Sequence, residues 1–373
     1  MADEGYNLEF KGGYLHIHHI PYVNSLKEVQ VGTLVSSLTL NGHVAQYDNN
    51  HVIQFMGEQP CDIINSISHT DTVQDLGNNI IINRSFSNKP PEGYKDYYEK
   101  FKRYAEIISA PAKSIKPEIS ATPFLPVKNE SEDSSSVFQY VDTNTSRANI
   151  GFMNEKFNNQ KIGIIGLGGT GAYILDLVAK TGVAEIRLFD NDILSTHNAF
   201  RSPGAASFEE LSAQYSKVDF YTEKYSRMHK NIIPNRTFLY EENLHLIADL
   251  DFIFIAIYRN TSRKVIAEFL YENHIPFIDV GLGVELVDGQ LTSVVRLSSF
   301  FTETEFKPED RLPFEETKEN AYNSNIQIAE LNSLNENLAV IKWKKFMGFY
   351  QDLNLENHSV YCLNANQLTD ERA

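Results

Sequence analysis

KIGIIGLGGTGAYILDLVAK, residues 161–180, is the stretch of sequence that decides the fold. Its opening run, KIGIIG, is almost entirely apolar, which is typical of a strand buried on both faces of a parallel sheet. The run GTGAYILDLVAK has the character of a helix. Four glycines lie where strand turns to helix: Gly166, Gly168, Gly169 and Gly171. Glycines there permit a tight turn and let backbone N–H groups approach a phosphate at the helix N-terminus. A tight turn without a ligand is the alternative interpretation.

Further apolar runs alternate with helical patterns on the C-terminal side of this stretch. The strand-like runs are AEIRLFD (184–190), DFIFIAIY (251–258) and PFIDVG (276–281). NTSRKVIAEFLYENH (260–274) predicts a helix between the last two. A long helix follows, NIQIAELNSLNENLAVIKWKKF (325–346), with one apolar stripe formed by Ile328, Leu331, Leu334, Leu338 and Ile341. This alternation predicts an α/β, Rossmann-like domain with a mostly parallel sheet covered on both faces.

The N-terminal third of the chain has a different pattern. GTLVSSLTL (32–40) and GHVAQYDNNHVIQFMG (42–57) read as short strands, and residues 93–110 have helical spacing. Prolines and the polar run KNESEDSSSV (128–137) follow, which is typical of a linker. We therefore predict a smaller α+β module at 1–127, a polar linker at 128–144, and the α/β domain at 145–373.

Composition excludes several classes of protein. The formal charge of −16 argues against partners that present phosphate backbones or anionic lipid surfaces, so neither nucleic acid nor membrane is expected as a partner. No apolar run reaches the length of a membrane span, and MADEGYNLEF lacks the features of a signal peptide. The two cysteines, Cys61 and Cys362, form no CxxC pair, so neither a disulfide framework nor a cysteine zinc site is predicted. A cytoplasmic protein is expected.

Polar residues beyond the second strand indicate which nucleotide the loop holds. Asp190 ends that strand, where an acid normally binds ribose hydroxyls of either NAD or ATP. Three further residues, Asn198, Arg201 and Lys217, then place an amide and two cations beyond it. A nicotinamide site has no need of such a group, whereas nucleotidyl transfer builds charge on phosphate that cations stabilise.

In these motifs the sequence resembles the ThiF/MoeB family, whose fold ubiquitin-activating enzymes share. The GxGGxG loop, the D-x-D of Asp190 and Asp192, and the N-x-x-R of Asn198 and Arg201 match the family pattern. A lysine heading a helix is also present, although Lys217 lies a few residues farther on than usual, and the helix is expected to end in NIIP (231–234) where the family has N-P. The resemblance implies an ATP- and Mg²⁺-dependent adenylyltransferase that activates the C-terminal glycine carboxylate of a ubiquitin-like protein. Transfer to a conjugating enzyme would follow.

The same resemblance implies roles for individual residues. The four loop glycines, with Asp190 and Asp192, would bind ATP, and Asn198, Arg201 and Lys217 would stabilise the transferring group. Ser146-Arg147, upstream of the first strand, resembles the start of the family's domain, where an arginine enters the site of the partner subunit. A homodimer with Arg147 acting in trans is therefore expected.

Three departures from the family pattern bear on mechanism. Tyr258 stands where the family has a magnesium-binding Asp, and Asp279 is the candidate substitute, with a helix cap or a structural acid as alternatives. Zinc-binding CxxC pairs are missing. The segment before the long helix has no acyl-accepting cysteine, so Ser324 is the nearest nucleophile there, with a helix N-cap as the blander interpretation. Cys362 is predicted to be a buried apolar residue.

Alternatives remain open at this point. His16, His18 and His19 cluster in YLHIHHIPY, for which a metal site and hydrogen-bonded histidines are both readings. An NAD-dependent oxidoreductase and a non-catalytic scaffold that binds a ubiquitin-like protein are the other function classes. The resemblance implies that the N-terminal module, like modules fused to ThiF domains in bacteria, docks a protein substrate or carrier. It favours protein conjugation, as in bacterial defence, over sulfur transfer.

Overall fold

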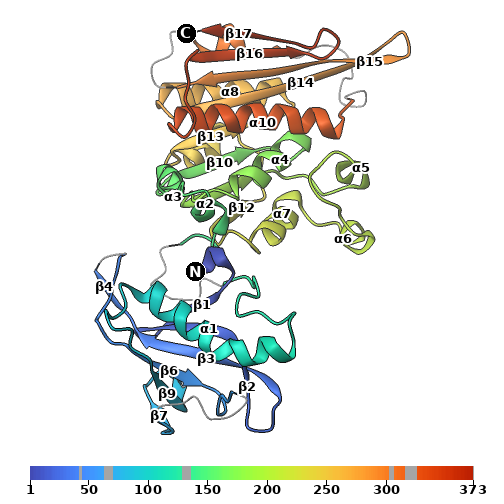
Figure 1. The fold of residues 1–373 in the computed structure, drawn as a ribbon. Helices are drawn as coiled ribbons and strands as arrows, with labels where there is room; N and C mark the ends of the chain where they lie inside the picture. Colours follow the sequence, from blue (N-terminus) through green and yellow to red (C-terminus); the bar gives the residue numbers. More distant parts are fainter. Residues whose placement is uncertain (42–43, 63–69, 128–135, 302–305, 316–325, 373) are drawn as a thin grey trace. The chain divides into compact units, whose positions relative to one another are not determined.

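The computed structural model describes residues 1–41, 44–62, 70–127, 136–301, 306–315 and 326–372 (Figure 1). The chain forms two compact units. The N-terminal unit comprises Met1–Ser135 and Tyr140–Asn149, and the C-terminal unit comprises Ser136–Gln139 and Ile150–Ala373. The chain passes from one unit to the other within the predicted linker and again just after it. Residues 128–135 of that linker lie outside the described part of the chain.

The N-terminal unit is built on a five-stranded antiparallel sheet with the order β1-β2-β3-β6-β9. Its strands are β1 (Asn7–Lys11), β2 (Tyr14–Val23), β3 (Val29–Ser37), β6 (Val52–Met56) and β9 (Arg84–Ser87). Two short ribbons accompany it, formed by β4 (Thr39–Asn41) with β5 (Val44–Gln46) and β7 (Gln74–Asp75) with β8 (Ile81–Ile82). The smaller domain is therefore an antiparallel sheet, in agreement with the α+β prediction.

Helix α1 (Tyr97–Ile115) covers this sheet, and it confirms the predicted helix. Asp96 caps its N-terminus by accepting a hydrogen bond from the backbone of Glu99, as an N-cap residue does. Its buried face carries the residues expected at helical spacing: Tyr97, Phe101, Tyr104 and Ile108. These side chains form one core with apolar residues of β2, β3, β6 and β9.

The C-terminal unit is built on an eight-stranded sheet with the order β12-β11-β10-β13-β14-β15-β16-β17. The first five strands in this order run parallel, and the pairs from β14 onward are antiparallel. Their bounds are β10 (Lys161–Ile165), β11 (Glu185–Phe189), β12 (Ile232–Asn235), β13 (Phe252–Ile255), β14 (Phe277–Val287), β15 (Gln290–Phe300), β16 (Glu356–Cys362) and β17 (Gln367–Arg372). The predicted mostly parallel α/β sheet is confirmed.

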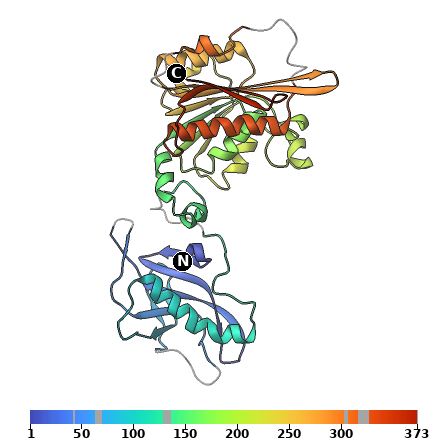
Figure 2. The ribbon, with the colours of Figure 1, turned by 45° about the horizontal axis from the view of Figure 1, so that its top comes forward.

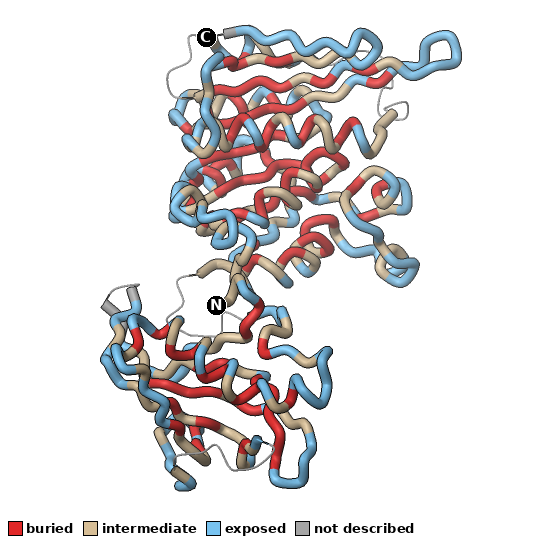
Figure 3. The backbone as a smooth tube through the Cα atoms, viewed as in Figure 1, coloured by how far each residue is buried: buried red, intermediate tan, exposed pale blue. Residues whose placement is uncertain are grey.

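Helices cover both faces of this sheet. On one face lie α4 (Gly169–Val178), α7 (Lys217–Tyr225) and α10 (Ala329–Phe346), whose apolar side chains share a core with Ile162, Ile164 and Phe252 (Figure 1). The other face carries α8 (Asn260–Glu272) and the 3-10 helix η3 (Glu241–Ile247), with their own apolar cluster. The central strands are buried, as parallel strands between two helical layers must be (Figure 3).

Shorter helices connect these elements. They are η1 (Ala2–Glu4), α2 (Thr143–Arg147), α3 (Gly151–Asn154), η2 (Glu155–Phe157), α5 (Thr196–Ala199), α6 (Phe208–Ser212) and α9 (Pro308–Arg311). No described helix combines the length and the apolar composition that crossing a lipid bilayer requires.

The structure corrects four local predictions. The run NIIP, expected to end the helix that begins at Lys217, forms strand β12 instead. Strand β14 continues well past PFIDVG and forms with β15 a hairpin that projects from the sheet (Figure 2). Cys362 ends β16 half-buried, because that strand lies near the sheet edge. The expected apolar stripe of the long helix is wrong at Ile341, which is 42% exposed, whereas Leu331 is buried and Leu338 packs against the core.

Candidate active site at the carboxyl edge of the parallel strands

The glycine loop joins the end of β10 to the start of α4, as its sequence predicts. Gly166 has a φ of +89°, and a Cβ there would lie 2.5 Å from the carbonyl oxygen of Ala256. A Cβ on Gly171 would lie 1.8 Å from the carbonyl oxygen of Gly166. Both positions therefore require glycine for the turn itself, whether or not a ligand binds.

The middle glycines meet different surroundings. A Cβ on Gly168, the N-cap residue of α4, would have no atom within 4 Å, so the space beside it is open to a ligand. A Cβ on Gly169 would lie 2.2 Å from the side-chain nitrogen of Asn332 on α10. The open position lies at the N-terminus of α4, where backbone N–H groups and the helix dipole favour an anion.

Asp190 organises the loop from the end of β11. Its side chain is almost fully buried, and its two carboxylate oxygens accept the backbone N–H of Leu167 at 2.7 Å and of Asp192 at 2.8 Å. Burial raises the pKa of this carboxyl, while nearby Lys217 and the two N–H donors lower it. Each carboxylate oxygen has a second lone pair, which leaves Asp190 able to accept further hydrogen bonds.

Lys217 lies between the two acids of the D-x-D motif. It is the first residue of α7, and its Nζ donates to Asp192 at 2.6 Å and lies 3.7 Å from Asp190. The lysine is buried, whereas the Asp192 side chain is 43% exposed. The structure thus brings Asp190, Asp192 and Lys217 together at the carboxyl edge of the sheet.

Asn198 and Arg201 lie on and after the short helix α5. The Asn198 side chain is buried and accepts the backbone N–H of Ser195 at 2.9 Å, so it closes the turn that leads to Arg201. Burial lowers the pKa of His197, and the charges of Arg201 and Lys217 lower it further. Asn332, which lies against Gly169, donates to the carbonyl oxygen of Arg201 at 3.5 Å, so the backbone at Arg201 lies near the glycine loop.

Asp279 lies farther along the same edge, in β14. It is fully buried, its Oδ2 accepts a hydrogen bond from Arg263 Nε at 2.8 Å, and its Oδ1 accepts one from Arg296. Tyr258, which follows β13, is 44% exposed. Two guanidinium groups therefore occupy the carboxylate that the sequence offered as a magnesium ligand.

The structure leaves two predicted catalytic residues untested. Arg147 belongs to the N-terminal unit, where its guanidinium lies 5.8 Å from the ring centroid of Phe124. Ser324 lies outside the described residues. The roles of both residues stay predictions.

Helix α10 supplies residues to the site that the sequence interpretation missed. Asn332 is buried, accepts the Thr170 hydroxyl at 2.9 Å and lies against Gly169, so it braces the glycine loop from across the domain. Asn335 and Glu336 are buried beside it. Polar residues at positions i, i+3 and i+4 of one helix were the available signal, because that spacing puts them on one face.

Glu336 is a buried glutamate whose pKa is raised well above the ordinary value of its side chain. Burial and, less strongly, the nearby Asp176 carboxylate raise its pKa to about 8, against a smaller opposing effect of Lys180. The folded protein therefore binds a proton that the unfolded chain releases near pH 4.5, and stability should fall as pH rises from about 4.5 to about 8.

We expect Glu336→Gln to remove this pH dependence, because glutamine keeps the shape of the protonated acid without ionising. At pH 8.5 the variant should be more stable than the wild type by about 4 kcal/mol, and near pH 4.5 the two should agree. Urea unfolding of both proteins across this range measures the difference. Parallel pH profiles for the two proteins would contradict the buried-acid assignment.

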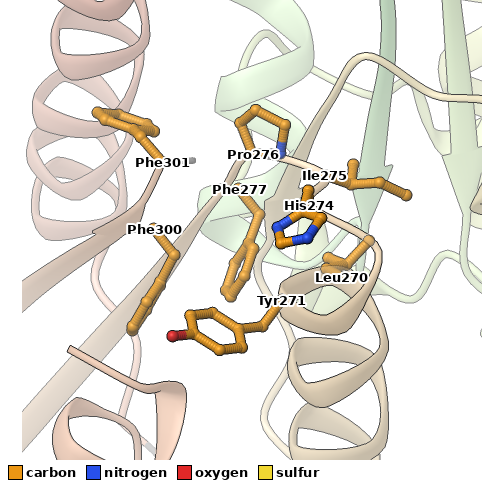
Figure 4. Close-up of a pocket in the computed structure, with 8 residues that line it drawn as sticks. All are labelled: Leu270, Tyr271, His274, Ile275, Pro276, Phe277, Phe300 and Phe301. Atoms are coloured by element: carbon orange, nitrogen blue, oxygen red, sulfur yellow. The ribbon is translucent and has the colours of Figure 1, made fainter. Parts of the chain in front are cut away.

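An apolar pocket also lies in this unit, but at the opposite edge of the sheet. Tyr271, His274 and Pro276 line it together with Phe277, the first residue of β14, and Phe300, the last of β15 (Figure 4). The amino ends of the parallel strands lie there, away from the glycine loop.

Among the described residues, no group of three or more His, Cys, Asp or Glu side chains could hold a metal ion. In the histidine cluster of the N-terminal unit, His18 pairs with Glu9 at 2.8 Å.

Comparison with known proteins identifies the relatives of both parts of the chain. Residues 1–143 match the family described as "Domain of unknown function (DUF6791)", and residues 144–335 match the ThiF family. No curated protein sequence matches the chain.

Solved structures share the fold of the C-terminal unit. E. coli MccB with MccA-N7isoASN is 18% identical, with 61% of this chain and 70% of MccB covered and a TM-score of 0.50. MccB, named as a microcin C7 biosynthetic enzyme, in complex with N-formylated MccA is 16% identical over 61% and 68%, with a TM-score of 0.50. At such identities the likeness shows the fold alone. The match to the ThiF family model spans more than half of the residues, and this chain therefore belongs to the ThiF family of adenylyltransferases.

Proposed function

We propose that this enzyme uses ATP to adenylate the C-terminal glycine carboxylate of a ubiquitin-like protein. The observation that carries the proposal is the arrangement at the carboxyl edge of the sheet. There the open space at Gly168 lies at a helix N-terminus, Lys217 pairs with Asp192 after β11, and the backbone of Arg201 is held beside the loop by Asn332. Membership of the ThiF family supports adenylyl transfer and replaces the alternative of an NAD-dependent oxidoreductase.

In the proposed reaction a carboxylate oxygen attacks the α-phosphorus of ATP. A new P–O bond forms, the bond to the bridging oxygen breaks, and pyrophosphate leaves with the electron pair. The carboxylate is already ionised near neutral pH and needs no general base. Charge grows on the α-phosphate and on pyrophosphate, where Lys217 and Arg201 stabilise it, with Asn198 holding the turn. Asp190 and Asp192 would accept hydrogen bonds from ribose.

The residues at the site do not fit a magnesium ion at Asp279. Both oxygens of that carboxylate are bound by guanidinium groups, and a divalent cation would be repelled by Arg263 and Arg296. Asp190 is engaged by two backbone N–H groups, and Asp192 by Lys217. The proposed steps therefore rest on the cations of this chain.

The partners of the reaction are part of the proposal. A homodimer would allow Arg147 to act on the site of the neighbouring subunit, and a conjugating enzyme would receive the activated carboxylate. The N-terminal unit would dock the protein substrate or the carrier. Support for these roles comes from the family resemblance and from the separate fold of that unit.

Nucleotide-dependent thermal stability tests the proposal. With 1 mM ATP and magnesium chloride, a dissociation constant of about 10 μM would stabilise the protein by about 2.7 kcal/mol, a rise in Tm of roughly 5 °C. NADH at the same concentration should leave Tm unchanged. A shift with NADH and none with ATP would contradict nucleotidyl transfer.

A further inference from the structure

Three charged side chains form a buried group where β14 passes the end of β13. They are Asp279, Arg263 and Arg296. In the parallel pairing Asp279 lies opposite the last residue of β13. The next residue, Ala256, contributes the carbonyl oxygen that closes around Gly166. The charged group thus lies at the same edge of the sheet as the glycine loop.

Arg263 is committed to structure. It reaches from α8 with its side chain only 5% exposed, and its Nε donates to Asp279 at 2.8 Å. Its two terminal nitrogens donate to the Asn260 side chain and to the carbonyl oxygen of Ile257. All three nitrogens are engaged, so this arginine anchors the backbone just before Tyr258.

Arg296 is placed differently. It comes from β15, donates to Asp279 and to the Ser298 hydroxyl at 2.7 Å, and keeps 17% of its side chain exposed. Its guanidinium lies over Gly281, where a Cβ would come within 2.9 Å of a terminal nitrogen. A Cβ on Gly283 would meet only one atom, at 4.0 Å. Bare backbone thus borders the exposed side of this cation.

The group carries one positive charge in excess. Within the described residues, the only ion pairs of Arg263 and Arg296 are with Asp279, and a guanidinium does not lose its proton near neutral pH. A largely desolvated cation without a full counter-charge is costly, and a carboxylate is the anion whose geometry a planar guanidinium matches.

We propose that Arg296 binds the C-terminal carboxylate of the protein substrate, and that Asp279 is a positioning residue that holds Arg296 rather than a metal ligand. This rests on the proposed adenylation. The substrate chain would approach in extended form along the glycine backbone of β14. One carboxylate oxygen is held by Arg296 while the other attacks the α-phosphorus.

Peptide binding to the full chain tests this proposal. The probes are two fluorescein-labelled octapeptides ending in Gly-Gly, one with a free carboxylate and one with a C-terminal amide, measured by fluorescence polarisation without ATP. The wild type should bind the carboxylate form about tenfold more tightly, as expected for one charge-assisted contact. Arg296→Gln should bind both forms equally, and Arg296→Lys should restore part of the preference.

Arg187→Gln is the matched control. Arg187 is 18% exposed and pairs with Glu185 and Asp249, near the amino ends of the parallel strands. This variant should keep the wild-type preference. Equal affinity of the wild type for both peptides, including no binding of either at 5 mM, would overturn the proposal, as would a preference that survives in Arg296→Gln.

Asp279→Asn separates the positioning role from a metal role. The variant should lose carboxylate preference as Arg296→Gln does, and the double variant should show no additional loss. If Asp279→Asn does not fold, the two Arg296 variants decide. If Asp279→Asn keeps the preference for the carboxylate peptide but needs a higher magnesium concentration before ATP raises Tm, the positioning role is overturned. Because peptide binding is measured without ATP, a wild type that fails to respond to ATP counts against adenylation, not against Arg296.

Discussion

Arg201→Ala is expected to lower ATP–pyrophosphate exchange, driven by the cognate protein, by about 10²–10³-fold. The reason is that the backbone of Arg201 lies beside the glycine loop through Asn332, and under the proposed reaction alanine removes charge that would stabilise the transition state. The loss should fall on the maximal rate more than on the Tm shift caused by ATP, because the charge being stabilised develops only during transfer.

Arg227→Ala provides the control for this experiment. Arg227 follows α7, and its side chain is 73% exposed and paired only loosely with Glu223 at 3.7 Å. Its replacement removes the same charge from the same unit and should leave exchange at the wild-type rate. Exchange by Arg201→Ala within twofold of wild type would sink the catalytic assignment, provided that both variants unfold at similar temperatures.

The same substitution at two loop glycines is expected to lower the stability of the protein by very different amounts. Gly171→Ala places a Cβ 1.8 Å from the carbonyl oxygen of Gly166, and no flexible side chain is available to move aside. We expect a loss of about 3 kcal/mol of stability or more, measured by urea unfolding. Gly168→Ala places its Cβ in open space and should cost less than about 1 kcal/mol.

ATP binding, in contrast, should be weakened by Gly168→Ala even though the variant folds. The methyl group at position 168 occupies the space into which a phosphate would approach the backbone at the N-terminus of α4. About tenfold weaker ATP binding is expected, which corresponds to one charge-assisted hydrogen bond. Wild-type affinity in a well-folded Gly168→Ala protein would show that the open space is not where phosphate binds.

Local sequence patterns predicted much of the fold correctly. Apolar runs such as that of β10 have no polar face to expose, so they must lie between two layers, and this dictates a parallel sheet with helices on both sides. The glycine loop and the acids of the D-x-D motif were predictable for a related reason. They lie within a few residues of strand ends, and the carboxyl ends of parallel strands meet at one edge.

Features that depend on distant contacts were not predictable in the same way. The stripe expected on the long helix included Ile341, yet the buried face of α10 carries Asn332, Asn335 and Glu336. Apolar periodicity assumes that buried positions are apolar. Here the helix packs on a glycine loop with hydrogen-bonding groups to satisfy, and polar side chains do that better than leucine.

Asp279 marks the boundary between what the sequence determined and what only the tertiary structure decided. By itself the sequence determined an α/β fold, a loop shaped by glycine, and an acid near the end of a later strand, since each follows from residues that are neighbours in the chain. The partners of that acid come from α8 and from β15, which reach it only through the packing of a helix and the register of a hairpin. A carboxylate takes its role from the charges beside it, and those charges were assembled by folding.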